Sequence, residues 1–180
     1  MESLRQKHTF APVYDSHSTI LILGSFPSVK SREQNFYYGH PRNRFWDVLS
    51  EIFQENIPKE IEEKKDFLLK HRIALWDVCE ECEITGSADS TIRHVIPNKI
   101  GLILKSASIR EIYVNGKKAE ALYQKYLFPM TGRNAVLLPS TSPANAACTL
   151  DALIQAWYCI RYVPAENGST FDDIGEMEKI

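Results

Sequence analysis

The chain has 180 residues, 44% of them hydrophobic and 24% charged, which indicates one globular domain and excludes a mainly disordered or fibrous chain. Four cysteines are too few for a disulfide scaffold, no apolar run could span a bilayer, and the first residues lack a secretory signal, so we expect a cytoplasmic protein without a membrane partner. The net charge of −2 does not exclude a nucleic-acid partner, because residues 30–44 carry four Lys and Arg against one acid.

Four short apolar runs predict buried strands. The first, residues 19–24, is rich in isoleucine and leucine and ends at a glycine. The other three are residues 72–78, 111–115 and 135–138.

Helices are predicted between these strands. Apolar residues recur at helical spacing over 45–53, and Ser142 followed by Pro143 is typical of a helix start. Residues 79–98 are expected to form a loop with a short helix. The predicted helices are 45–53, 58–69, 100–104, 117–126 and 142–160, and a strand is the alternative for residues 100–104.

Strands that alternate with helices favour an α/β fold. We expect a three-layer α/β/α domain over residues 19–162, with a short, mainly parallel, four-stranded central sheet. Residues 1–18 are predicted to form an irregular N-terminal arm and residues 163–180 an acidic C-terminal tail.

Ligands of such sheets bind at the carboxyl ends of the strands, so the loops that follow the strands should build any active site. The segment 25–46 after the first strand combines aromatic residues with arginines, asparagines and a histidine. Aromatic faces stack on bases and guanidinium groups hold phosphates, although core packing of Phe36 or Phe45 is an alternative. The four loops are residues 25–42, 77–90, 115–116 and 139–145.

Two strings in these loops carry a family resemblance. Gly24-Ser-Phe-Pro-Ser28, followed after eleven residues by His40-Pro-Arg-Asn-Arg-Phe-Trp46, resembles the first motif region of the uracil-DNA glycosylase superfamily. The string Leu138-Pro-Ser-Thr-Ser-Pro-Ala-Asn145 resembles its second motif. Both are most similar to the deoxyinosine (hypoxanthine) branch, and the resemblance covers roughly residues 19–162.

One position departs from the wider superfamily. Most members carry Asp or Asn two residues after the first-motif glycine, to orient or activate the attacking water, whereas this chain has Phe26. The deoxyinosine branch implies that Asn43 positions the water instead, and Asn35 is the second candidate.

The resemblance also implies binding residues. Phe26, Tyr38 and Asp77 are candidates for contact with an extruded base. Tyr38 could equally be a half-buried loop tyrosine and Asp77 a helix cap. The candidates for contact with DNA are Ser28, Arg42, Arg44, Ser140, Ser142 and Asn145, and either arginine could instead pair with Asp47.

No cofactor is expected. Cys79 and Cys82 have the spacing of metal ligands, but Cys148 and Cys159 lie too far apart on one predicted helix to complete a zinc site. We therefore expect reduced cysteines and no bound metal.

The function that the resemblance implies is monofunctional DNA glycosylase activity. The enzyme would flip a deaminated base, hypoxanthine first and uracil second, out of double-stranded or single-stranded DNA and hydrolyse its N-glycosidic bond. We expect a monomer, associated with the nucleoid through its DNA. The alternatives are a uracil-preferring glycosylase, a catalytically silent module that binds damaged DNA, and a protein that binds free nucleotides.

Overall fold

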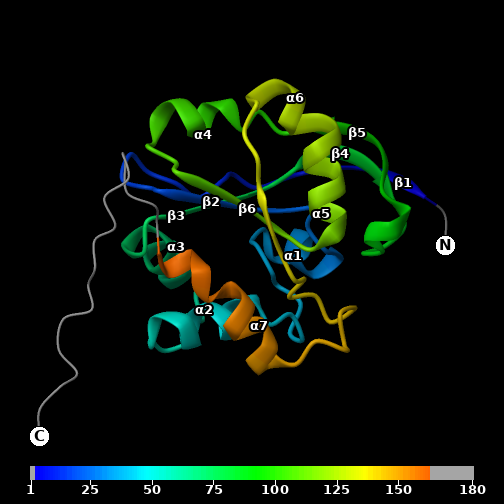
Figure 1. Cartoon of the computed structure of the whole chain (residues 1–180). Coiled ribbons are helices and arrows are strands. Elements are labelled where there is room, and N and C mark those ends of the chain that lie inside the picture. Colours follow the sequence, from blue (N-terminus) through cyan, green and yellow to red (C-terminus); the bar gives the residue numbers. More distant parts are fainter. Residues whose placement is uncertain (1–2, 163–180) are drawn as a thin grey trace, which may run out of the picture.

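The computed structural model describes residues 3–162. A parallel sheet of four strands, in the order β3-β2-β6-β7, crosses the molecule (Figure 1). All four strands were expected from the apolar runs, to within one residue at each end. They are β2 (Ile20–Gly24), β3 (Ile73–Asp77), β6 (Glu111–Asn115) and β7 (Val136–Leu138).

Helices cover both faces of this sheet, which confirms the three-layer α/β/α fold (Figure 1). One face carries α4 (Gly101–Ser106), α5 (Lys117–Leu122) and α6 (Phe128–Thr131), with a π-helical turn at Tyr123–Leu127 between the last two. The other face carries α2 (Phe45–Phe53), α3 (Ile61–Lys70) and α7 (Leu150–Trp157), which a 3-10 turn at Tyr158–Arg161 extends.

A second, antiparallel sheet corrects two expectations. Its strands, in the order β1-β4-β5, are β1 (Leu4–Lys7), β4 (Cys79–Ile84) and β5 (Arg93–Pro97). The predicted irregular arm therefore begins with a paired strand. The stretch expected to hold a loop and a short helix is mainly a hairpin, with a 3-10 turn at Asp89–Thr91.

Irregular pairing explains why β4 does not look like a strand in the sequence. Its register with β5 shifts between Cys79 and Glu81 and again between Glu81 and Glu83. Because of these bulges, Cys79 and Cys82 are both buried although they are three residues apart in the sequence. Burial at this spacing is typical of helices rather than of strands.

One helix was not expected, and two helices start later than expected. The first loop contains a short helix, α1 (Val29–Gln34), which Ser28 caps by accepting a hydrogen bond from the Ser31 amide at 3.2 Å. Helix α3 begins at Ile61 rather than at residue 58, after a capping box formed by Glu60 and Glu63. Helix α7 begins at Leu150, because Thr149 rather than Ser142 is its N-cap.

An aromatic stack below the sheet joins α2 and α7 to the first loop. The Phe45 ring lies 3.9 Å from the Tyr38 ring, nearly parallel to it, and meets the Trp157 ring edge-on at 5.8 Å. Trp157 is fully buried, and its Nε1–H donates to the carbonyl of Pro139 at 2.9 Å. The stack therefore holds the loops after β2 and β7 against each other.

The predicted acidic tail lies outside the described residues. Within residues 3–162, none of the helices is both long and apolar enough to cross a membrane.

Candidate active site

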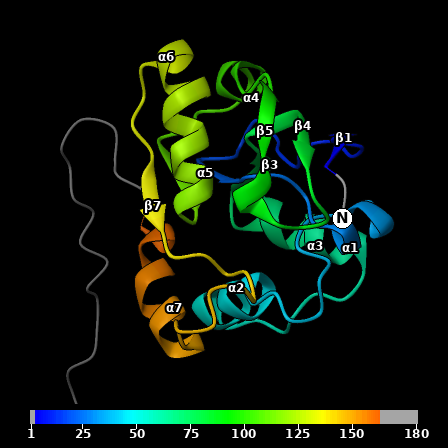
Figure 2. The same cartoon turned by 90° about the vertical axis from the view of Figure 1, so that its right-hand side faces the viewer.

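The carboxyl ends of the four parallel strands meet at one edge of the sheet, which faces the viewer in Figure 2. Gly24 is paired with Asp77 across β2 and β3, and Asn115 with Leu138 across β6 and β7. Polar residues gather at this edge, as expected for a ligand site of an open parallel sheet.

Asp77 is the most enclosed charged group of this edge. The residue is 4% exposed, and its Oδ2 lies 2.8 Å from Nε2 of His8, which follows β1. Its backbone carbonyl accepts a hydrogen bond from the side chain of Asn98 at 2.9 Å. Its other oxygen, Oδ1, lies over Gly24, where a Cβ would come within 2.3 Å of it.

Tyr38 closes the same corner. A Cβ at Gly24 would lie 3.2 Å from its Oη, so the phenol and the Asp77 carboxylate face one point. One face of the Tyr38 ring is covered by Phe45. Burial, and secondly the charge of Asp77, raise the pKa of Tyr38 far above its usual range, so the phenol stays protonated.

A hydrogen-bonded chain connects Tyr38 to Asn43. Nδ2 of Asn115 donates to Tyr38 Oη at 3.2 Å and to Thr141 Oγ1 at 3.0 Å. The Thr141 hydroxyl in turn donates to Asn43 Oδ1 at 2.9 Å. Since the Thr141 amide donates to Asn115 Oδ1 and the Phe45 amide to Asn43 Oδ1, both side-chain amides have a fixed orientation.

This network determines what Asn43 can offer a ligand. Two donors already occupy its Oδ1, so a water held by that oxygen would compete with the Thr141 hydroxyl. No residue within 3–162 accepts a hydrogen bond from its Nδ2, which leaves that amide group available to a ligand or a water. The water-positioning role of Asn43 stays a prediction.

Arg44 ties the loop after β7 to the start of α2. Its guanidinium donates to the backbone carbonyls of Asn145 at 2.9 Å, of Ser142 at 3.3 Å and of Cys148. These bonds hold residues 142–148 in successive turns, which explains why the predicted helix does not start at Ser142. Contact between Arg44 and a phosphate stays a prediction.

The other predicted DNA-binding residues of this loop also bond within it. Ser140 Oγ accepts from the Ser142 amide and Ser142 Oγ from the Ala144 amide, both at 3.2 Å. The Asn145 side chain donates to the Ser140 carbonyl at 2.9 Å. The loop is therefore preorganised, and its DNA contacts stay predictions.

Three candidates of the first loop, Phe26, Ser28 and Arg42, lie outside the hydrogen-bonded chain between Tyr38 and Asn43. Phe26 is 6% exposed and lies between the His8 ring and the guanidinium of Arg32, which is 5.5 Å from its ring centre. The hydroxyl of Ser28 caps α1. Arg42 is exposed, and the described ion pairs join neither it nor Arg44 to Asp47. Their ligand contacts stay untested.

A second carboxyl group lies near Asp77. Ser25 Oγ, next to Gly24, donates to Asp89 Oδ2 at 2.6 Å. Loss of solvent around the Asp89 carboxyl group, and then the charge of Asp77, raise its pKa, although the residue as a whole is exposed. Neither Asp89 nor His8 was a sequence candidate.

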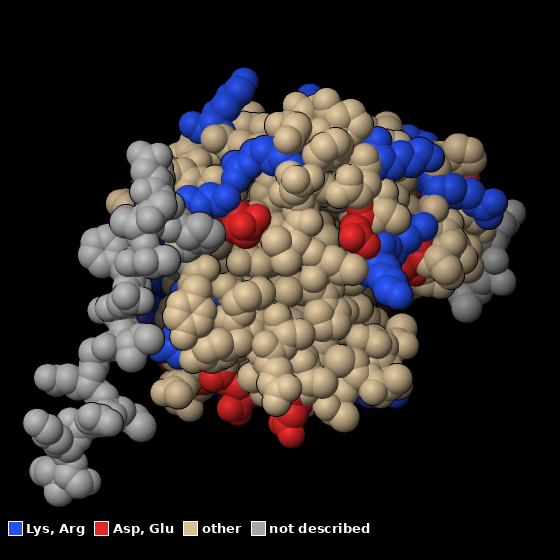
Figure 3. Space-filling model, viewed as in Figure 1, with Lys and Arg blue, Asp and Glu red and all other residues tan. Residues whose placement is uncertain are grey.

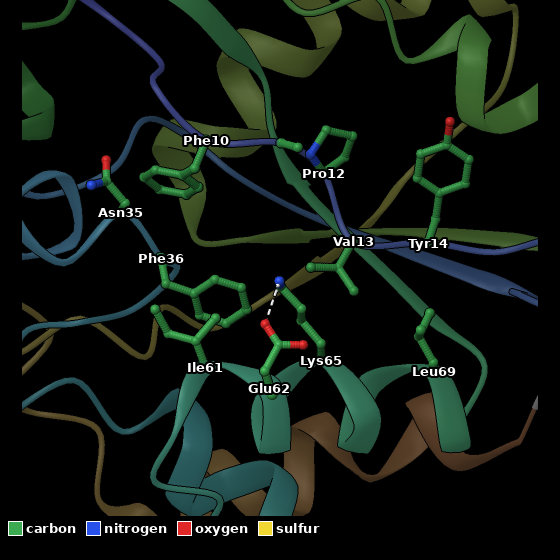
Figure 4. Close-up of a pocket in the computed structure, with 11 residues that line it drawn as sticks. Phe10, Pro12, Val13, Tyr14, Asn35, Phe36, Ile61, Glu62, Lys65 and Leu69 are labelled. Carbon is green, nitrogen blue, oxygen red and sulfur yellow. Dashed lines mark hydrogen bonds and ion pairs between the residues drawn. The ribbon is translucent and has the colours of Figure 1, made fainter.

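A hollow of about 570 Å³ lies elsewhere, between residues 10–14 and α3 (Figure 4). Asn35, the second catalytic candidate, lines this hollow, and its Oδ1 accepts from Thr9 Oγ1 at 3.3 Å. The hollow shares no lining residue with the polar edge. We place the site at the strand ends, because the convergent polar groups are there, and the structure does not bring Asn35 to it.

The four cysteines are free thiols, and Cys79 and Cys82 are buried in β4. The part of the chain that the structure describes holds no group of three or more His, Cys, Asp or Glu side chains able to bind a metal. Figure 3 shows Lys and Arg side chains across the upper part of this face, on its left as well as its right, while the surface over β7 and α7 is mostly uncharged.

Comparison with known proteins agrees with this fold. The Uracil DNA glycosylase superfamily matches residues 11–160. A "Hypoxanthine DNA glycosylase" of Methanosarcina acetivorans is 41% identical over 141 residues, which are 77% of this chain and 88% of that protein. One of the same name from Methanosarcina barkeri is 34% identical over 78% of this chain and 89% of its own length. The solution structure of a candidate uracil DNA glycosylase from M. acetivorans superposes with a TM-score of 0.74 at 32% identity, covering 88% of this chain and 98% of that one.

Proposed function

Since the chain belongs to the Uracil DNA glycosylase superfamily, we propose that it excises hypoxanthine from DNA as a monofunctional glycosylase, with uracil as a second substrate. Hydrolysis of the N-glycosidic bond leaves an abasic site. The names of the two Methanosarcina relatives support hypoxanthine as the first substrate.

Asp77 is the observation that carries this proposal. Its Oδ1 is a nearly buried acceptor at the end of β3, over a glycine that leaves room beside it. Hypoxanthine presents an N1–H and uracil an N3–H, and a carboxylate accepts either. Adenine and cytosine present a lone pair at the equivalent position, which a carboxylate repels.

Excision requires the base to leave the duplex, because the sugar carbon cannot be reached inside the stack. Tyr38 and Asn115 flank the corner that would receive the extruded base. The preorganised loop of residues 139–149 and the exposed Arg42 would hold the surrounding backbone.

The reaction passes through a sugar with oxocarbenium character as the base leaves. Asn43 would position the attacking water, and the DNA phosphates would add negative potential beside the cationic sugar. Such positioning and fixed electrostatics lower the barrier to base release. We propose a cytoplasmic monomer that needs no cofactor and acts on double-stranded or single-stranded DNA.

Single-turnover base release tests the proposal directly. Duplexes with one deoxyinosine, one deoxyuridine or no lesion would be incubated with excess protein. We expect hypoxanthine release at least tenfold faster than uracil release, and none from intact DNA. Faster uracil release would indicate the uracil-preferring alternative. Lesion binding without release would indicate the silent module, and cleavage of free nucleosides alone a nucleotide-binding protein.

Gly24→Ala is expected to slow hypoxanthine release roughly tenfold to thirtyfold, below the roughly hundredfold that a 1 Å misplacement can cause. The new Cβ would lie 2.3 Å from Asp77 Oδ1, so the carboxylate must move. Single-turnover rates would measure the effect, and thermal melting would show whether the protein folds.

Gly101→Ala is the matched control, because a Cβ there meets nothing within 4 Å. We expect its rate to stay within twofold of wild type. Equal rates for Gly24→Ala and wild type would show that the space over Gly24 is not used by the base.

A further inference from the structure

We propose that His8 is a positioning residue of this site: its Nε2–H holds Asp77 Oδ2, so that Oδ1 faces the base as a fixed hydrogen-bond acceptor. The inference rests on the proposed function for its effect on catalysis. Its structural part, the state of the imidazole, can be measured without any reaction.

The contact between the two residues is short and enclosed. Nε2 of His8 and Oδ2 of Asp77 are 2.8 Å apart, and the side chains are 2% and 6% exposed. A contact of this kind on the surface would be loosened by water, whereas this hydrogen bond is shielded from it. The contact therefore determines the direction of the carboxylate.

The backbone holds His8 in place. Its amide donates to the carbonyl of Glu80 at 2.7 Å, which continues the pairing of β1 with β4. Its ring packs against Phe10 at 4.5 Å, Tyr37 at 6.0 Å and Phe26 at 6.2 Å between ring centres. The imidazole thus has little freedom to turn away from Asp77.

The second ring nitrogen indicates which protons are present. Nδ1 of His8 is buried and has no hydrogen-bond partner within the described residues. A proton on Nδ1 would be a buried donor without an acceptor, which is costly. The geometry therefore favours a neutral imidazole with its proton on Nε2, bonded to an ionised carboxylate.

This arrangement assigns the two oxygens of Asp77 different tasks. Oδ2 accepts from His8, while Oδ1, over Gly24, has no hydrogen bond to residues 3–162. An ionised Oδ1 can only accept, so it selects bases with an N–H at that position. His8, from a segment outside the parallel sheet, would thereby enforce the preference for hypoxanthine over adenine and for uracil over cytosine.

Three variants test this role in the full-length protein. His8→Phe keeps an aromatic ring but removes the hydrogen-bond donor. We expect single-turnover hypoxanthine release to fall about tenfold to a hundredfold, which is the usual loss when a residue that orients a metal-binding side chain is removed. His8→Gln places an amide N–H near the position of Nε2 and should recover most of that rate. His17→Phe is the control, since His17 is 79% exposed and its pairing with Asp15 spans 3.8 Å; we expect a rate within twofold of wild type.

Nitrogen NMR of the wild-type histidine rings decides the structural part. We expect a protonated-type shift for Nε2 of His8 and a lone-pair-type shift for Nδ1. A proton on Nδ1, or a folded His8→Phe protein that releases hypoxanthine at the wild-type rate, would overturn the inference. If wild type releases no base from any lesion, the proposed function has failed, and the nitrogen shifts alone then decide the state of His8. Should His8→Phe not fold, the rate of His8→Gln decides, and a loss as large as a hundredfold would contradict the assigned donor role.

Discussion

Asn43→Ala is expected to lower the single-turnover rate of hypoxanthine release about a thousandfold. Losses of roughly 10²- to 10⁴-fold are typical when a group that positions or polarises the reacting atoms is removed. Asn43 is the polar side chain of the first motif that joins the strand-end network, and Phe26 cannot replace it. Base release from a deoxyinosine duplex, measured with excess enzyme, would report the effect on the chemical step.

A structural contribution must be separated from this loss, because Asn43 Oδ1 also accepts from the Phe45 amide and the Thr141 hydroxyl. Thr141→Val is the matched control: it keeps the shape and removes the hydroxyl from the chain. We expect a decrease of about tenfold or less, since Asn43 stays fixed by Phe45. An equal loss in both variants would show that Asn43 acts by holding the loops together. An unchanged rate in Asn43→Ala would indicate that Asn35 or backbone groups position the water instead.

Although Val136 and Leu137 of β7 are exposed, the other three strands of the parallel sheet, β2, β3 and β6, could be predicted because they are mostly buried on both faces. Such strands appear as uninterrupted apolar runs, and β2 and β6 lie within one residue of the predicted bounds. Helix α2 was recognised from the helical spacing of its apolar residues, which form one buried face. Local sequence sufficed where the burial of an element leaves a regular pattern along the chain.

The antiparallel sheet could not be predicted, because its pattern depends on a distant partner. Strand β1 is short and polar, and only pairing with β4, more than seventy residues away, makes it a strand. The bulges of β4 hide the alternation that marks a strand. His8 was missed as a consequence, since it reaches Asp77 only through this pairing.

The loop after β7 shows a local signal that tertiary contacts overrule. Ser142 and Pro143 form a suitable helix start in sequence terms. The guanidinium of Arg44, about a hundred residues earlier, takes the carbonyls of Ser142 and Asn145 that a helix would use. A capping signal cannot reveal such competition.

Asp77→Ala is expected to slow hypoxanthine release at least a hundredfold and to lessen discrimination against adenine and cytosine. A hydrogen bond to a charged group contributes about 1.5–3 kcal/mol of binding free energy. The truncation also leaves the buried Nε2–H of His8 without an acceptor. Rates on deoxyinosine, deoxyuridine and deoxyadenosine duplexes would show whether the loss is confined to bases with an N–H. A loss of protein stability would instead lower all measured rates alike. Thermal melting under the same conditions would report the stability change, which we expect to be about 1–3 kcal/mol.

Asp77→Asn distinguishes recognition from charge. The Nε2–H of His8 requires an acceptor, so the amide oxygen would turn toward His8 and the NH₂ group toward the base. That donor faces the N1–H of hypoxanthine but matches the N1 lone pair of adenine. We therefore expect Asp77→Asn to lose at least as much activity on deoxyinosine as Asp77→Ala. Adding His8→Gln to Asp77→Asn should restore part of the discrimination against adenine, because a glutamine side chain can donate or accept. A single Asp77→Asn variant that retains wild-type release of hypoxanthine would show that residue 77 does not read the N1–H, and that the selectivity of this fold lies in the shape of the corner between Gly24 and Tyr38.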